Sequence, residues 1–94
     1  MQTQHETVGG QAYDYIPLGQ HIVRALGVCG GRPTFKYTRI EVAGVLARLG
    51  AGESMDAIVA GYGDRVTREA VQEAIDIAAD RANRTVEQWQ VDAG

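Results

Sequence analysis

Cysteine is almost absent from this 94-residue sequence, in which Cys29 occurs alone. A single cysteine excludes an internal disulfide, so a buried apolar core has to hold the fold together. Long apolar runs are missing as well, since none approaches the roughly 20 residues that a membrane-spanning helix needs. The polar N-terminus also lacks the apolar segment of a secretory signal. We therefore expect one small domain in the cytoplasm, without a membrane partner.

The signature motifs of common enzyme classes are missing too. The sequence contains no HExxH, no CxxC, no GxSxG and no glycine-rich loop with the spacing that nucleotide binding needs. His21 and Cys29 could in principle form a base–nucleophile pair, but a strand histidine and a small buried thiol are the simpler interpretation. The sequence thus predicts a protein that is not an enzyme, with no catalytic residue, cofactor or metal.

Charge is distributed unevenly along the chain. Residues 1–50 hold five Lys and Arg against three Asp and Glu, whereas residues 51–94 hold four Arg against nine Asp and Glu. The net charge of −3 argues against a general polyanion binder, because neutralising phosphates requires a basic surface. A basic half joined to an acidic half favours self-association or a charged protein partner.

The local sequence pattern divides the chain into three segments. Residues 1–12 are polar and show no periodicity, so we expect a disordered arm. Residues 13–35 are rich in β-branched and aromatic residues bounded by glycine and proline, which predicts a short β ribbon that turns at Gly30-Gly31. Residues 85–94 form a C-terminal tail, which leaves residues 13–84 as the folded domain.

The first predicted helix begins after this ribbon. Thr38 and Glu41 have the spacing of a capping box, in which the cap side chain and a later carboxylate satisfy each other's backbone amides. An apolar stripe follows at helical spacing: Val42, Val45, Leu46 and Leu49. Gly44 lies inside this helix, where glycine is unfavourable, so we expect another element to pack closely against it.

Two further helices complete the predicted fold. Ser54 is the expected cap of the second helix, and Thr67 is that of the third, which should end near Asn83. A brief glycine-containing turn separates these two helices, as in a helix-turn-helix. The predicted fold class is therefore mainly α: a trihelical, helix-turn-helix-like core preceded by a short N-terminal β ribbon.

Two stretches of sequence carry a resemblance to a known family. Residues 30–40 read GGRPTFKYTRI, and residues 50–54 read GAGES. Around them lie Leu46, Ile58, Tyr62, Val66-Thr67 and Val71. This arrangement resembles the family known as domain of unknown function 433, with its pattern of G-G-[RK]-P, a G-T-R-I stretch, a leucine-rich helix, A-G-E-S and a final helix. The similarity covers about residues 22–82.

The resemblance implies a helix-turn-helix protein that follows a short β segment and assembles as a dimer. Many members are regarded as antitoxins, similar to those that neutralise PIN-like ribonuclease toxins, and no enzymatic activity or cofactor is attached to the family. Two positions depart from its pattern: Tyr37 stands where glycine is usual, and Glu41 where proline is frequent. The first departure should change the loop before the first helix.

A protein-binding module accounts for more of these features than any other class. We favour a dimeric, antitoxin-like neutraliser or adaptor, whose partner is a PIN-like nuclease or a larger assembly. The ribbon would pair with a second copy, and the acidic third helix would face a basic partner. Trp89 either covers the small core or anchors the partner. The candidate partner contacts are Ile22, Val23, Glu69, Glu73, Asp76 and Trp89.

Two alternatives remain open. A DNA-binding transcriptional regulator would insert the start of the third helix into the major groove and contact phosphates through nearby basic residues. Carboxylates along the same helix, including Asp80, oppose this alternative. The candidate nucleic-acid contacts are Arg32, Lys36, Arg39, Arg65, Arg68 and Gln72. The other alternative is a scaffold or accessory subunit of a larger complex.

Overall fold

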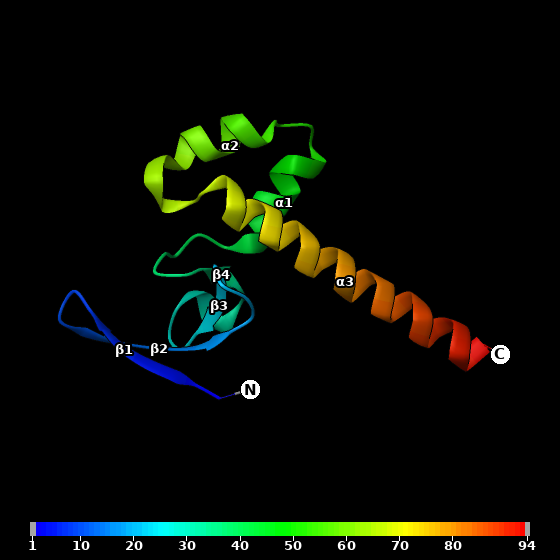
Figure 1. Cartoon of the computed structure of the whole chain (residues 1–94), viewed down its shortest axis with the longest axis horizontal. Coiled ribbons are helices and arrows are strands. Elements are labelled where there is room, and N and C mark those ends of the chain that lie inside the picture. The colour runs from blue at the N-terminus through cyan, green and yellow to red at the C-terminus, as the bar shows by residue number, and fades with distance from the viewer. Residues whose placement is uncertain (1, 94) are drawn as a thin grey trace.

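A computed structural model describes residues 2–93, and their side chains through residue 84. Four strands come first in the chain and three helices follow, as Figure 1 shows. A short 3-10 turn at Cys29–Gly31 lies between the third and fourth strands, and another at Gly63–Arg65 lies between the second and third helices. The elements are β1 (Gln4–Val8), β2 (Gln11–Pro17), β3 (Ile22–Ala25), β4 (Thr34–Phe35), α1 (Val42–Gly50), α2 (Met55–Tyr62) and α3 (Arg68–Ala93).

The strands form one antiparallel sheet in the order β1-β2-β3-β4. Its first hairpin turns at Gly9 and Gly10, whose φ angles are +58° and +79°. A tight two-residue hairpin needs two consecutive positive φ angles, which glycine adopts without steric cost. The fold class predicted from the sequence is therefore wrong: the chain combines a substantial four-stranded sheet with three helices, and the sheet is more than a short ribbon.

The N-terminal strand explains much of this correction. The sequence predicts a disordered arm over residues 1–12 because the side chains there are polar and have no apolar face. The structure instead forms β1 there, at the edge of the sheet, with four of its five residues exposed. The predicted turn at Gly30-Gly31 does adopt positive φ angles, but it lies in a 3-10 turn within the longer β3–β4 connection.

The sheet separates two apolar clusters. Successive residues of a strand point to opposite faces, and accordingly Ile22 and Val23 of β3 belong to different clusters. The larger cluster joins the sheet to the helices and includes Phe35, Val45, Ile58 and Val71. The smaller cluster, on the face away from the helices, contains Tyr15, Val23 and Ala25. The sheet is thus an integral part of the core.

Helix α1 begins at Val42, four residues after the predicted start at Thr38. The Thr38 hydroxyl donates to the Phe35 carbonyl (2.8 Å) and accepts from the Ile40 amide (3.0 Å), so it stabilises a turn. Glu41 occupies the N-cap position without a side-chain cap, and its backbone forms a β-bridge with β4. The capping-box prediction is wrong because this segment runs beside β4 before the helix starts.

The caps of the other two helices are confirmed, but the predicted end of the third is wrong. Backbone amides donate to Ser54 Oγ and Thr67 Oγ1, each at 3.1 Å. Helix α3 runs to Ala93 instead of ending near Asn83. No glycine or proline interrupts it, so no residue in its sequence favours an earlier end. In Figure 1 its C-terminal half projects away from the sheet and the other helices.

Candidate functional site

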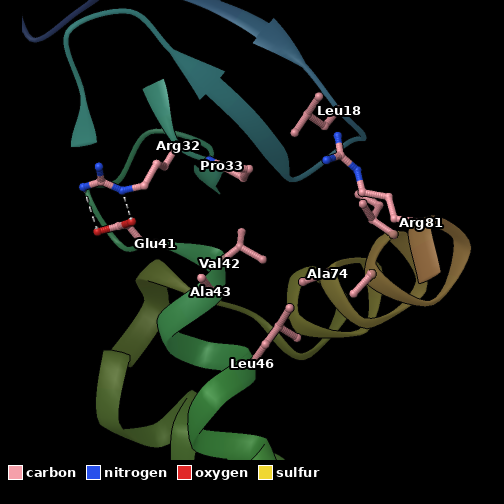
Figure 2. A pocket seen from close by; sticks show the side chains of 11 residues that line it. Leu18, Arg32, Pro33, Glu41, Val42, Ala43, Leu46, Ala74 and Arg81 are labelled. Carbon is pink, nitrogen blue, oxygen red and sulfur yellow. Dashed lines mark hydrogen bonds and ion pairs between the residues drawn. The ribbon is translucent and has the colours of Figure 1, made fainter. Parts of the chain in front are cut away.

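An apolar groove lies beside α3, where this helix meets α1 and two loops of the sheet (Figure 2). Its volume is about 230 Å³. Apolar side chains from both helices, the β2–β3 turn and the loop before β4 form its walls; they include Leu18, Pro33, Ala43, Leu46, Ala74 and Ile77. The groove is also lined by Ala78 of α3, and because Ala43 and Ala78 are small and accessible, a side chain that enters the groove can approach both helices.

A salt bridge between Arg32 and Glu41 borders one side of this groove (Figure 2). Arg32 Nε donates to Glu41 Oε1 at 2.6 Å, and Arg32 Nη2 donates to Glu41 Oε2 at 3.4 Å. These hydrogen bonds stabilise the charged carboxylate and so hold the pKa of Glu41 below its ordinary value. The pair gives the groove an oriented polar edge, although such an exposed bridge contributes little to stability.

Leu18 and Arg81 lie together at another side of the groove (Figure 2). A second hollow, of about 330 Å³, shares these two residues and Ile77 with the groove. The rest of its lining is charged and consists of Glu73, Asp76, Asp80 and Arg84. The apolar groove therefore continues directly onto the acidic face of α3, where three carboxylates lie beside Arg81 and Arg84 and Asp80 forms a salt bridge with Arg84.

Glu73 has a structural role on this face. Its carboxylate accepts hydrogen bonds from the backbone amides of Gln20 (2.9 Å) and His21 (2.7 Å). These bonds fix the β2–β3 turn, which carries Leu18, against α3 and so position one wall of the groove. Of the other predicted partner contacts on α3, Glu69 and Asp76 are exposed.

The predicted nucleic-acid contacts do not form one surface. Lys36 and Arg65 line a common hollow of about 240 Å³ beside His21 and Thr67. Arg32 instead borders the apolar groove. The structure therefore brings together only part of the predicted set.

Most of these residues also have partners within the chain. Arg68 forms a salt bridge with Asp56, and Lys36 forms one with Glu6 at 3.6 Å. The Arg65 guanidinium donates to a backbone carbonyl, and Gln72 donates to Asp76. Arg39 is exposed, and its guanidinium has no hydrogen-bond or ion-pair partner among the described residues. Phosphate binding would compete with the existing carboxylate partners of Arg32, Lys36 and Arg68.

Two further predicted partner contacts are inaccessible. Ile22 and Val23 are 1% and 0% exposed, because each packs into one of the two apolar clusters. The fold therefore leaves neither side chain exposed for a contact with a partner. The Trp89 side chain lies outside the described residues.

Among the described residues, no hydrogen bond joins the side chains of the hypothetical pair Cys29 and His21. Cys29 Sγ donates to the Arg39 carbonyl at 3.4 Å, whereas the backbone amide of His21 donates to Glu73. Among the described residues, no group of three or more His, Cys, Asp or Glu side chains could hold a metal ion.

One polar and aromatic cluster is missed by the sequence analysis. Glu6 accepts hydrogen bonds from the hydroxyls of Tyr15 and Tyr37, and Lys36 Nζ lies 4.8 Å and 5.0 Å from the centres of these two rings. The interaction between Lys36 and the Tyr15 side chain is the main reason why the pKa of Lys36 is raised. The Gly9-Gly10 pair between two polar stretches was the available signal, because it marks a hairpin.

Comparison with protein families identifies the central part of the chain. The model of the family described as "Protein of unknown function (DUF433)" matches residues 22–78, more than half of the sequence. The chain belongs to this DUF433 family. The match confirms the resemblance inferred from the GGRP and AGES stretches. Searches of curated proteins and of solved structures find no match.

The DUF433 region contains most of the groove but not all of it. Residues 22–78 supply Arg32, Glu41 and the α1 wall, whereas Leu18 and Arg81 lie just outside the matched range. The β1–β2 hairpin is also outside this range. Among the described residues, no helix combines the length and the apolar character needed to cross a membrane.

Proposed function

We propose that this chain is a non-enzymatic protein-binding module that acts as an antitoxin-like neutraliser or as an adaptor. The observation that most supports this proposal is the apolar groove that opens onto the acidic face of α3. A complementary partner presents an amphipathic segment, with apolar side chains for the groove and Lys or Arg beside them for the carboxylates.

The size of the groove indicates that the acidic face has to take part. Stable protein–protein interfaces bury about 1,200–2,000 Å² of surface in total, whereas a groove of about 230 Å³ accepts only a few side chains. The carboxylates of Asp76 and Asp80 extend the surface along α3. Asp80 forms a salt bridge with Arg84, whereas Asp76 accepts only from the neutral Gln72 amide, so Asp76 is the carboxylate that a basic partner meets more readily. Its charge also speeds association with such a partner and makes the rate depend on salt.

A basic partner is consistent with the antitoxin-like role. A ribonuclease needs a positively charged surface to bind the RNA backbone, and an acidic helix face can compete for that surface. The antitoxin role that the family resemblance implies would use the same chemistry. A basic subunit of a larger assembly is the alternative occupant, and the chain would then be a scaffold or accessory subunit.

A matched pair of substitutions on α1 tests the groove. Ala43 and Ala47 are both exposed on this helix, but only Ala43 lines the groove. Ala43→Arg fills the groove with a long charged side chain, and Ala47→Arg is the control. We expect tagged wild-type protein and Ala47→Arg to retain the same partner from the native cell, and Ala43→Arg to lose it. Equal retention by both variants would refute the assignment of the groove.

DNA binding is the second candidate function. It has support from the hollow that joins Lys36 to Arg65 at the start of α3, but the pairing of Lys36 with Glu6 opposes it. If DNA binds there, affinity falls steeply as salt rises, and Arg65→Glu weakens it more than Asp76→Lys does. A fluorescence-anisotropy titration of a promoter fragment that shows no such difference would exclude this surface.

The predicted homodimer is also part of the proposal. Because Ile22 and Val23 are buried, the exposed edge of β1 is the available strand for pairing with a second copy. Light scattering on the full chain at tens of micromolar should give twice the monomer mass. A monomer at that concentration would end the dimer prediction without affecting the groove.

A further inference from the structure

The exposed large apolar residues of the described chain gather at another hollow, which is neither the groove beside α3 nor one of the hollows already described. Val8, Leu26 and Tyr37 are 40%, 61% and 52% exposed. All three line one hollow of about 350 Å³, together with the β1–β2 turn, the loop after β3 and the loop before α1. Scattered apolar residues are normal on a protein surface, but their gathering around one concavity indicates an interaction site.

This hollow lies on the sheet face away from the helices. Tyr13 and Val28 contribute to its lining, and both pack on the smaller apolar cluster. The groove beside α3 is lined by residues of the helices and of the loops that meet them. The two concavities therefore do not share a lining residue.

The Tyr37 ring is held in place before any partner arrives. It lies 5.4 Å from the Tyr13 ring, its backbone amide donates to the Tyr13 hydroxyl at 2.9 Å, and its own hydroxyl donates to Glu6 at 2.7 Å. The φ angle of Tyr37 is +67°, a conformation unfavourable for a bulky residue. Because this side chain is already ordered, a partner loses little conformational entropy by packing against it.

Arg39 supplies the charge at this hollow. Its guanidinium has no hydrogen-bond or ion-pair partner among the described residues, whereas those of Arg32, Arg48 and Arg68 each pair with a carboxylate. This exposed cation lies beside a hollow that is also lined by the exposed side chains of Leu26 and Tyr37. The combination is complementary to a carboxylate that accompanies an apolar side chain.

We propose that this hollow docks an extended segment of another protein that presents an apolar side chain next to an Asp or Glu. A nucleic acid fits less well, because a single cation, Arg39, lines the hollow and one cation neutralises only one phosphate. Tyrosine and arginine, which line this hollow as Tyr37 and Arg39, are enriched in protein-binding hot spots. With the groove beside α3, the chain has two separate surfaces for protein partners.

Selection from a phage-displayed library of random peptides on the immobilised full chain tests the proposal. We expect the wild type to enrich peptides that combine Leu, Ile or Phe with Asp or Glu. Arg39→Glu should weaken the best peptide by about ten-fold or more and shift a new selection towards Lys and Arg. Leu26→Ser should weaken the same peptide without changing its charge preference.

Arg24→Glu is the matched control, because Arg24 is also exposed but does not line the hollow. It should keep the wild-type affinity, and circular dichroism melts should show that all variants fold. Three results would overturn the proposal: no enrichment, an unchanged selection with Arg39→Glu, or peptide binding that Ala43→Arg abolishes. Conversion of a wild-type dimer to a monomer by Arg39→Glu would also overturn it, since a second copy would then occupy the hollow.

Discussion

The hydroxyl of Tyr37 donates a hydrogen bond of 2.7 Å to Oε1 of Glu6, a residue 31 positions earlier in the chain. The bond ties the loop before α1 to the edge strand β1. Tyr37 stands where the family pattern usually has glycine, and its φ angle of +67° explains that usual preference. In this chain the Tyr37 side chain, which a glycine would not provide, connects the loop before α1 to β1.

The first prediction concerns this connection. Tyr37→Phe keeps the ring against Tyr13 but removes the hydroxyl, so β1 should open more often while the helical core remains intact. Hydrogen exchange followed by NMR should show amides of the β1–β2 hairpin exchanging several-fold faster, because local opening sets that rate. The amides of α1 serve as the internal control. Equal acceleration in both elements would mean that the effect is global and not local.

The second prediction concerns pH. The hydroxyl of Tyr15, followed by that of Tyr37 and by Lys36, holds the pKa of Glu6 below its ordinary value of 4.5. A carboxyl with a lowered folded-state pKa stabilises the fold above its unfolded pKa, and this stabilisation is lost as pH falls through the folded-state value. The free energy of unfolding should therefore decrease below about pH 4.5.

Glu6→Gln separates this contribution from those of other carboxyls. The variant should be less stable than wild type at pH 7, and the difference should shrink as pH falls towards 3. Some pH dependence remains, because Arg32 lowers the pKa of Glu41 and Arg48 lowers that of Glu53. Urea titrations at several pH values measure the difference. Parallel curves for the two proteins would contradict the assigned role of Glu6.

The elements that could be predicted from the sequence are those set by local interactions. The caps at Ser54 and Thr67 and the buried positions Val42 and Val45 of α1 depend on residues within one or two helical turns. Strand β1 could not be recognised in this way, because an exposed edge strand needs no apolar face and its pairing depends on a partner strand. The sheet was underestimated for this reason.

The candidate site was harder to predict than the helices. The GGRP stretch marks Arg32 in the sequence. The salt bridge of Arg32 to Glu41 and its position beside an apolar groove result from the tertiary fold. The sequence predicts Glu73 to be a partner contact, because its local sequence is that of a solvated helix face. Its actual bonds join it to amides 52 and 53 positions away, a separation that no local pattern indicates.

The third prediction uses a buried hydroxyl. Thr34 is completely buried, and its Oγ1 has no hydrogen-bond partner within the part of the chain that the structure describes. An unsatisfied buried polar group costs about 1–3 kcal/mol, so Thr34→Val should increase the free energy of unfolding by about 1 kcal/mol. Thr34→Ser keeps the hydroxyl and loses the methyl group, and should decrease it. If urea unfolding shows Thr34→Val to be less stable than Thr34→Ser, the buried hydroxyl stabilises the fold and the prediction is wrong.

The fourth prediction compares two glycines with opposite expected effects. A Cβ atom at Gly19 would lie 2.5 Å from Glu73 Oε1, so Gly19→Ala has to displace the carboxylate that accepts from the amides of Gln20 and His21. Losing these charge-assisted bonds should reduce the free energy of unfolding by about 1–2 kcal/mol. Glu73→Gln should give a smaller reduction, since an amide oxygen can still accept from one backbone amide.

Gly44, inside α1, is the glycine with which Gly19 is compared. The sequence suggested close packing at this position, but nothing lies within 4 Å of a Cβ built there, and the residue is exposed. That expectation is therefore wrong, and Gly44→Ala should stabilise the chain by about 0.5–1 kcal/mol through helix propensity alone. Urea unfolding followed by circular dichroism measures both alanine variants. If they shift stability in the same direction, the contact between Gly19 and Glu73 does not control how α3 is fixed to the sheet.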